Sequence, residues 1–202
     1  MPMLRESITK TGTQENGVGA PSLDEVALVG RVSAGDGHAF EALYRCYHPR
    51  LWRFLERVTR RPQMVEEILN DTMLVVWRKA DTYNLRSKVS TWIFAIAFRK
   101  ALKALKRIDD PIEDSPIEGE TAANAGPEGE LMQHELRVYL SRAMQVLSIE
   151  QRAVVELTYY HDCHYREIAE IMGCPVDTVK TRMFHARRKL RVLLAGRMED
   201  MR

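Results

Sequence analysis

Apolar residues recur every three or four positions along most of the chain, which is the spacing of an α-helix with one buried face. In the first half of the sequence, this spacing covers residues 23–29, 39–58, 65–77 and 92–105. Turn-forming or polar residues separate these stretches, and no stretch of useful length alternates in the manner of a β-strand. The pattern therefore predicts an all-α fold.

The second half of the sequence predicts three further helices in a particular order. One covers residues 153–160, a short one follows over 165–172, and a longer basic helix starts at Thr178. Gly173 stands where a helix end favours a left-handed residue, and Asp177 or the turn before it can cap the last helix. A short helix, a tight glycine-containing turn and a longer helix form a helix-turn-helix layout.

Composition divides the chain into segments. With 202 residues, 45% of them hydrophobic, it can form one domain or two small ones with real cores. Residues 1–21 lack periodicity and are predicted to be a disordered tail. Residues 22–107 are predicted to form one small helical domain and residues 130–202 a second. Proline and glycine punctuate segment 108–129, which is predicted to be a flexible acidic linker.

Charge is unevenly distributed along the chain, although the formal net charge is only +2. Residues 45–107 carry 15 basic and five acidic side chains, and residues 166–197 carry eight basic and three acidic ones. Between them, residues 108–130 carry eight acidic side chains and no basic one. Two basic blocks suggest a polyanionic partner, but solvated helix faces also carry many lysines and arginines. Charge alone leaves both interpretations open.

Several protein classes are excluded by what the sequence lacks. It has no run of about 18 apolar residues, so we expect no insertion into a membrane. The N-terminus lacks the pattern of a signal peptide. Cys46, Cys163 and Cys174 are scattered and odd in number, which argues against a disulfide framework. We therefore expect a cytoplasmic protein.

A cluster of histidines and cysteines invites a zinc hypothesis. His161, Cys163 and His164 are close in sequence, with Cys174 nearby, but their spacing matches no standard zinc-binding set. We therefore expect no metal and no other cofactor. The sequence also contains no phosphate-binding glycine loop, nucleophile elbow or catalytic carboxylate pair. No catalytic residue is assigned, and the protein is not expected to be an enzyme.

The last helix has the chemistry of a DNA-recognition helix. Val179, Met183, Ala186 and Leu190 are predicted to form its inner face, which leaves polar and basic side chains on the other faces. The alternative is a three-helix bundle that merely ends in a solvated basic helix. In the DNA-binding interpretation, base edges would be contacted by Lys180, Thr181 and His185, and phosphates by Arg182, Arg187 and Arg188.

Residues 92–106 interleave aromatic and basic side chains, as single-stranded DNA binding requires. Trp92, Phe94 and Phe98 offer ring faces on which bases can stack. The alternative is that these rings belong to the core, and we expect at least one of Trp92 and Phe94 to be buried. The polar loop 84–88 could bind the edge of an unstacked base.

These motifs together resemble one known family. Residues 147–190, with Tyr165-Arg-Glu-Ile-Ala169 and Gly173-Cys-Pro-Val-Asp-Thr-Val-Lys-Thr-Arg182, closely resemble region 4 of bacterial extracytoplasmic-function (group IV) sigma factors. The first domain resembles their region 2. Residues 35–44 resemble its opening helix, residues 66–78 its polymerase-binding helix and residues 83–93 its promoter-melting segment.

The resemblance implies an alternative sigma factor that binds core RNA polymerase, melts and reads the −10 promoter element, and recognises the −35 element. The polymerase would perform the chemistry. An anti-sigma protein, often membrane-bound in this family, is an implied partner.

The resemblance also implies three sets of contact residues. The implied −35 contacts are Tyr165, Arg166, Thr178, Lys180, Thr181, Arg182, Phe184, His185, Arg187 and Arg188. The implied −10 contacts are Asn84, Arg86, Ser87, Lys88, Ser90, Trp92, Arg99, Lys103 and Lys106. The implied polymerase contacts are Glu66, Glu67, Asn70, Asp71 and Trp77.

The sequence departs from the family at a few of these positions. Arg99 and Lys103 stand where members often have asparagine and aspartate, so the −10 preference cannot be carried over. Asn70 and Asp71 keep the polar character of the commoner glutamine and glutamate, so we expect polymerase binding to survive. The alternative for this acidic face is that it is merely solvated.

Two other functions compete with the sigma-factor hypothesis. A stand-alone helix-turn-helix regulator would bind duplex DNA without polymerase, but it would not need the motifs of the first domain. A sigma-like decoy would only sequester an anti-sigma protein, and it would not need to retain basic residues such as Lys180, Arg182 and Arg187.

Overall fold

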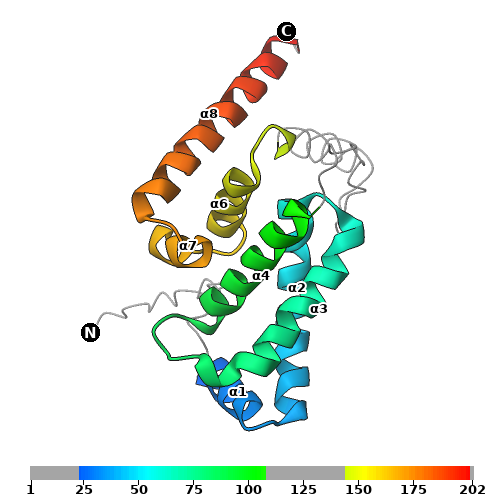
Figure 1. The fold of residues 1–202 in the computed structure, drawn as a ribbon. Helices are drawn as coiled ribbons and strands as arrows, with labels where there is room; N and C mark the ends of the chain where they lie inside the picture. Colours follow the sequence, from blue (N-terminus) through cyan, green and yellow to red (C-terminus); the bar gives the residue numbers. More distant parts are fainter. Residues whose placement is uncertain (1–22, 108–143, 201–202) are drawn as a thin grey trace, which may run out of the picture.

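The computed structural model describes residues 23–107 and 144–200, and these ranges are helical without any β-strand (Figure 1). The all-α prediction is therefore confirmed. The predicted tail, the linker and the start of the second domain near residue 131 lie outside the described residues. The elements are α1 (Leu23–Ser33), α2 (Gly37–Thr59), α3 (Pro62–Lys79), the 3-10 turn η1 (Ala80–Thr82), α4 (Val89–Lys106), α6 (Ile149–Tyr159), α7 (Tyr165–Met172) and α8 (Val176–Asp200).

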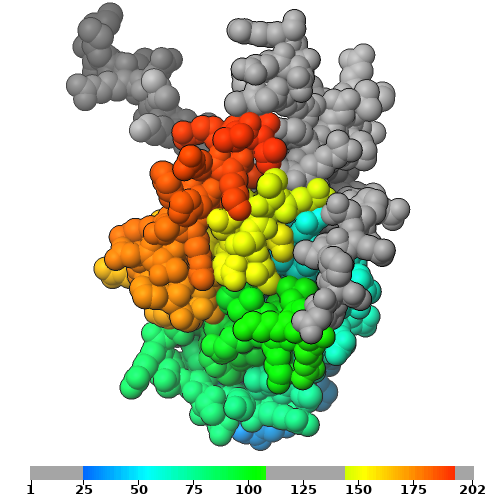
Figure 2. Space-filling view, turned by 45° about the horizontal axis from the view of Figure 1, so that its top comes forward, coloured from blue at the N-terminus to red at the C-terminus, as the bar shows by residue number. Residues whose placement is uncertain are grey.

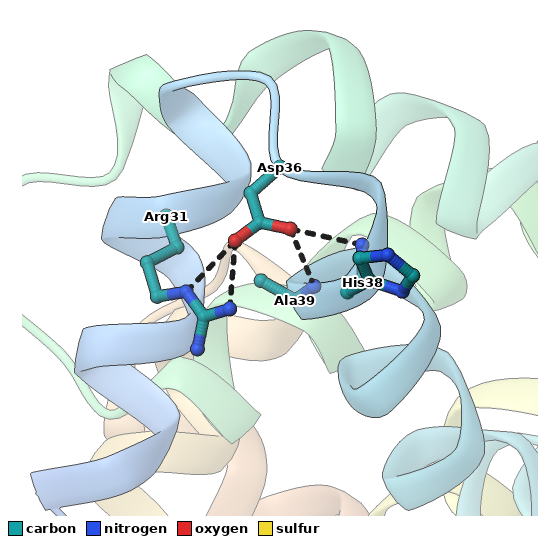
Figure 3. A network of polar contacts seen from close by, with 4 residues as sticks. All are labelled: Arg31, Asp36, His38 and Ala39. Atoms are coloured by element: carbon teal, nitrogen blue, oxygen red, sulfur yellow. Dashed lines mark hydrogen bonds and ion pairs between the residues drawn. The ribbon is translucent and has the colours of Figure 1, made fainter.

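A single aspartate organises the turn between α1 and α2 (Figure 3). One carboxylate oxygen of Asp36 accepts hydrogen bonds from the backbone N–H groups of His38 and Ala39, at 2.9 and 3.1 Å, and so caps α2. Its other oxygen accepts two hydrogen bonds from the Arg31 guanidinium, at 2.9 and 2.7 Å. The Arg31 hydrogen bond and the backbone bonds lower the pKa of Asp36, so the cap stays charged.

The first four helices form a bundle around aromatic and aliphatic side chains. The ring of Phe54 on α2 meets the ring of Phe94 on α4 edge-on, with centroids 5.1 Å apart, and both side chains are buried. Helix α2 ends at Thr59, its C-cap Arg60 has a left-handed φ of 56°, and Pro62 then occupies the first turn of α3. These two local features place α3 back against α2.

The second set of helices follows the predicted helix-turn-helix order. Ser148 and Gln151 form a reciprocal capping box at the start of α6, and Gly173 ends α7 with a left-handed φ of 61°, as the sequence predicts. The expected start of the last helix is wrong by two residues. Helix α8 begins at Val176, directly after Pro175, whose carbonyl accepts the N–H of Thr178. Asp177 therefore lies inside the first turn.

The two sets of helices share one hydrophobic core. Helix α4 packs against α7, and α2 packs against α6. Figure 2 shows α6 and the orange helix-turn-helix seated directly on the green helix α4. Residues 93–98 of α4 and 152–157 of α6 are buried without interruption, so these stretches of the two helices are covered on every side rather than along one stripe. No described helix is long and apolar enough to cross a membrane.

Candidate nucleic-acid interface

The inner face of α8 is the one that the sequence predicts. Val179, Met183 and Ala186 are buried and Leu190 is half-buried. Because these residues hold one side of α8 against the core, its opposite side faces outward. The outward side chains are Lys180, Thr181, Phe184, His185, Arg187 and Arg188, all of them exposed.

Several of the predicted −35 side chains already have partners within the chain. The Lys180 ammonium lies 2.9 Å from the Asp177 carboxylate, and the Thr181 hydroxyl donates to the Asp177 carbonyl. The half-buried Arg182 donates a hydrogen bond to the sulfur of Cys174, at 3.4 Å, so its side chain points toward the turn between α7 and α8. The exposed ion pair of Lys180 is weak and can exchange for a DNA phosphate.

The start of α8 borders a shallow hollow of about 590 Å³ that includes Arg166, Gly173 and Val176 among its lining residues. Arg166 is exposed, whereas Tyr165 and Thr178 are half-buried. The N-terminus of a helix carries partial positive charge and unpaired N–H groups, which favour phosphate. Arg166 and the start of α8 bring positive charge to this hollow, and Glu170, which also lines it, brings one negative charge.

Tyr159, on α6, was missed by the sequence analysis. Its hydroxyl accepts a hydrogen bond from the Arg187 guanidinium, at 2.8 Å, and its side chain is exposed. This contact positions Arg187 along the outer surface of α8. No motif marks such a contact, because the two residues are brought together only when α6 and α8 pack.

The loop before α4 is held by its own side chains. The Tyr83 hydroxyl donates to the carbonyl of Ser87, at 2.7 Å, and the carbonyl oxygen of the Asn84 side chain accepts the N–H of Arg86. Asn84 and Arg86 are exposed. Leu85 at the tip has a φ of 62° and is 67% exposed. This exposed apolar tip was also missed, because a positive φ at leucine leaves no trace in the sequence.

The aromatic residues of α4 belong mainly to the core. Phe94 and Phe98 are 1% and 2% exposed, so both rings belong to the core and not to a surface that stacks bases. The expectation that at least one of Trp92 and Phe94 is buried is confirmed. Trp92 is half-buried, with its ring 5.4 Å from that of Tyr83. Ser90 is half-buried as well. Of the predicted −10 residues of α4, the basic side chains that remain exposed are Arg99, Lys103 and Lys106.

Lys88 has a partner in the other set of helices. Its ammonium lies 2.7 Å from the carboxylate of Glu167 on α7. The hydrogen bond that Lys88 donates to the Glu167 carboxylate raises the pKa of Lys88. Lys88, a predicted −10 contact, is therefore paired with the helix-turn-helix in this structure.

The predicted polymerase-binding residues lie on α3. Glu66, Glu67, Asn70 and Asp71 are exposed, and Trp77 is half-buried against Phe40, with ring centroids 5.1 Å apart. Two of them also hold contacts across the bundle. Asn70 accepts a hydrogen bond from the Tyr44 hydroxyl, and Asp71 pairs with the Lys100 ammonium at 2.8 Å.

A row of half-buried aromatic rings on α2 lies beside this face and was missed by the sequence analysis. Phe40, Tyr44, His48 and Trp52 follow one another at four-residue intervals, and the last two rings stack with centroids 5.8 Å apart. The four-residue spacing was visible in the sequence, and it predicts neighbours on one helix face.

The histidine and cysteine cluster lies at the packing between the two sets of helices. His161 sits between Phe54 and Phe94, with ring centroids 6.0 and 4.6 Å away. Burial, with nearby arginines, lowers its pKa to about 4, and burial raises the pKa of Cys163 to about 11. Within the described ranges, no three histidine, cysteine or acidic side chains are placed to hold a metal ion.

Two charged residues of α6 are buried against α2. The Glu156 side chain is 1% exposed, and its carboxylate lies 2.8 Å from the Arg57 guanidinium. Burial raises the pKa of Glu156 to about 7, although Arg57 opposes the shift. Arg152 donates two hydrogen bonds to the Val58 carbonyl and one to the Leu147 carbonyl. Burial lowers its pKa to about 10.

Comparison with known proteins assigns both sets of helices. Residues 43–110 match the family model for sigma-70 region 2, and residues 137–190 match that for sigma-70 region 4. The chain is 31% identical to the ECF RNA polymerase sigma factor RpoE of Cereibacter sphaeroides, over 77% of this chain and 86% of the relative. It is 31% identical to SigM of Mycobacterium tuberculosis, over 80% of each chain. It is 30% identical to the sigma-E factor of Escherichia coli, over 82% of this chain and 91% of the relative.

Two solved structures share the fold. CnrH, in complex with the cytosolic domain of CnrY, aligns with a TM-score of 0.64 at 21% identity, over 86% of this chain and 98% of that one. RpoE from Bartonella quintana, in complex with the anti-sigma factor NepR, aligns with a TM-score of 0.59 at 24% identity, over 77% of this chain and 96% of that one.

Proposed function

Because the chain belongs to the extracytoplasmic-function (ECF) family of RNA polymerase sigma factors, it is a transcription initiation factor, and we propose that its two helical units divide promoter recognition between them. The first unit, α1 to α4, binds core RNA polymerase and the −10 element. The second unit, α6 to α8, binds the −35 element. The protein acts in the cytoplasm, where the polymerase performs the chemistry.

The outer surface of α8 is the single observation that carries this proposal. Its inner face is fixed by buried Val179, Met183 and Ala186, so the exposed side chains near its start are free to enter a major groove. Lys180, Thr181 and His185 supply donors for base edges, and Arg187 and Arg188 supply charge for phosphates. The partial positive charge of the helix start adds to this attraction.

The first unit offers two separate surfaces for its two tasks. The exposed acidic part of α3, with Glu66 and Glu67, suits a basic face of the polymerase. On the loop before α4, Asn84 and Arg86 are exposed and held in place by local hydrogen bonds, so they can receive an extruded base of the −10 element. The basic end of α4, with Arg99, Lys103 and Lys106, then follows the DNA backbone.

An anti-sigma protein is proposed as a further partner. Both solved structures of similar fold contain a bound second protein, which is the anti-sigma factor NepR for RpoE and the cytosolic domain of CnrY for CnrH. A stand-alone regulator accounts less well for this chain, because it does not explain why residues 43–110 match sigma-70 region 2. A decoy does not explain the basic side chains on the outer face of α8.

Charge reversal on α8 tests the proposal. Lys180→Glu places a negative charge where the helix enters the groove, and we expect promoter-specific transcription with core polymerase to fall at least tenfold. Lys189→Glu is the matched control, because the Lys189 ammonium turns toward the Val146 carbonyl, 3.1 Å away, at the start of the second unit. Equal transcription by the two variants would contradict the assignment of α8 as the recognition helix.

A further inference from the structure

Two exposed tyrosines stand at the end of α6, and one of them is joined to the recognition helix. Helices α6 and α8 pack against each other (Figure 1). Tyr159 is the last residue of α6 and Tyr160 is its C-cap. The Tyr160 ring lies 4.1 Å from the Arg57 guanidinium of α2. The Tyr159 hydroxyl instead binds the guanidinium of Arg187 on α8, at 2.8 Å.

The direction of this hydrogen bond leaves donors of both residues available. A guanidinium has only N–H donors, so the Tyr159 oxygen is the acceptor and its own hydroxyl hydrogen is not used. Within residues 23–107 and 144–200, that hydrogen has no acceptor. Arg187 uses one N–H for Tyr159 and keeps other donors of its planar fork. A neutral donor and a charged donor are therefore held together on an exposed surface.

Arg187 belongs to a row of exposed side chains along one flank of α8. Lys180, Phe184, Arg187 and Arg191 follow one another at intervals of four, three and four residues, so they share one side of the helix. Arg187 lies about 10 Å beyond Lys180 along the helix axis, at about 1.5 Å per residue. The major groove is about 12 Å wide. When Lys180 reaches base edges inside the groove, Arg187 and Tyr159 therefore lie at the phosphates that border it.

We propose that Tyr159 and Arg187 form a clamp for one phosphate of the −35 element, in which the Tyr159 hydroxyl and the Arg187 guanidinium donate to oxygens of the same phosphate group. This inference rests on the proposed function, because it takes α8 as the recognition helix. It extends the −35 interface to α6. The tyrosine has two tasks in the clamp: it holds the arginine, and it donates to the phosphate.

The clamp is formed before DNA arrives, unlike the other basic contacts of α8. A long side chain loses rotamer freedom when it binds, and a side chain already held in place loses less. The Arg187 guanidinium is held by the Tyr159 hydroxyl and lies 5.9 Å from the centre of its ring. Lys180 must first leave the Asp177 carboxylate. Arg187 has no acidic partner in the described part of the chain, so its whole charge is available to phosphate.

Removal of one hydroxyl tests the clamp in the complex of the full chain with core RNA polymerase. The probe is duplex promoter DNA that carries a start site mapped with this protein. Tyr159→Phe keeps the ring but removes the hydroxyl, and we expect affinity for the duplex to fall about fivefold, in the range of one net hydrogen bond. Tyr160→Phe is the matched control on the next residue and is expected to bind as the parent does. Parent-like affinity of Tyr159→Phe would overturn the proposal.

A double-mutant cycle shows whether the tyrosine acts together with the arginine. Arg187→Ala is expected to lower affinity and to reduce the slope of log K against log salt by about 0.9, which corresponds to one phosphate contact. In that background, we expect Tyr159→Phe to lower affinity by less than about twofold, because the hydroxyl and the guanidinium act as a unit. A tyrosine that merely stabilises the packing of α6 would cause the same loss in both backgrounds, and that result would overturn the clamp.

Neutral phosphates separate this proposal from the proposed function. A methylphosphonate, which replaces a charged phosphate oxygen by a methyl group, is placed at each phosphate of the −35 element in turn. We expect one position at which the parent loses affinity about fivefold, while Tyr159→Phe and Arg187→Ala each lose less than about twofold. If the parent responds at some positions and Tyr159→Phe responds equally at all of them, the clamp is overturned and the proposed function stands. If the parent responds at no position, the proposed function fails and the clamp fails with it.

Discussion

The guanidinium of Arg152 donates two hydrogen bonds to the carbonyl oxygen of Val58, which lies 94 positions earlier in the chain. A third donor of the same side chain reaches the Leu147 carbonyl, at 2.8 Å. One buried side chain thus joins the end of α2, the turn before α6 and α6 itself. This arrangement uses the planar fork of donors that arginine has and lysine lacks.

Replacement of Arg152 is expected to destabilise the folded chain. Arg152→Met fills similar space but leaves the carbonyls of Val58 and Leu147 without these donors, which costs about 1–3 kcal/mol. Urea unfolding measures the change in the free energy of unfolding. Arg152→Lys keeps the charge but cannot reach both carbonyls, so we expect it to recover less than half of the loss. Full recovery by lysine would contradict the role given to the guanidinium geometry.

The stability of the folded chain should depend on pH through two opposing groups. Glu156 has its pKa raised to about 7 in the folded chain, so its contribution is present at low pH and is lost as pH rises through about 7. His161 has its pKa lowered to about 4, so its contribution is present above its ordinary pKa of 6.5 and is lost as pH falls toward 4. Between pH 4.5 and 6.5 the two contributions change in opposite directions.

Single substitutions should reveal each contribution. In Glu156→Gln, we expect the free energy of unfolding to rise with pH between about 4 and 6.5 more steeply than in the parent chain, because only the His161 contribution remains. In His161→Phe, we expect it to fall more steeply between about 4.5 and 7. Chemical denaturation at a series of pH values measures both slopes. A pair of variants with the same slope as the parent would contradict the burial of these groups.

Two glycine substitutions should have effects of opposite sign. Gly173 ends α7 at a φ of 61°, so Gly173→Ala forces a side chain into a left-handed conformation and is expected to cost about 1 kcal/mol. Gly30 lies inside α1 with open space around it, so Gly30→Ala is expected to add about 0.5–1 kcal/mol of stability. Thermal unfolding of both variants checks the signs. Stabilisation by Gly173→Ala would contradict the geometry of the turn.

Substitutions at two adjacent residues of α8 should have different effects, one on stability and the other on DNA binding. Met183 is buried and Phe184 is 64% exposed. Met183→Ala is expected to cost about 2–4 kcal/mol of stability. Phe184→Ala should change stability by less than about 0.5 kcal/mol, while lowering affinity for promoter DNA. Denaturation measures the stability of the two variants, and binding to duplex DNA measures their affinity. A large loss of stability in Phe184→Ala would contradict the assignment of the face of α8 that points outward.

The elements and their chemistry follow from local patterns. The three- to four-residue spacing locates the helices, and Gly173 marks the end of α7 because its φ of 61° suits glycine. The sequence predicts the start of α8 two residues late, because Asp177 resembles a cap, whereas the Pro175 carbonyl accepts the N–H groups of Thr178 and Val179. Local patterns suffice where neighbouring residues determine the outcome.

The contacts between the two units could not be predicted from the sequence. Arg152 and Glu156 resemble solvated helix residues, because nothing near them in the chain shows that α2 will cover them. Phe94 and Phe98 likewise fit two roles in the sequence, because aromatic side chains recur at the same helical spacing in a core and on a DNA-binding surface. Long-range packing decides both cases.

Transcription of fragmented genomic DNA from the source organism by its core RNA polymerase, with and without this protein, tests the central claim most directly. Mapping the 5′ ends of the RNA is expected to show new, discrete start sites that share two spaced upstream elements. The Lys180→Glu variant should lose those starts. An absence of new starts, in a preparation where the protein binds the polymerase, would contradict the assignment of promoter recognition to its two helical units.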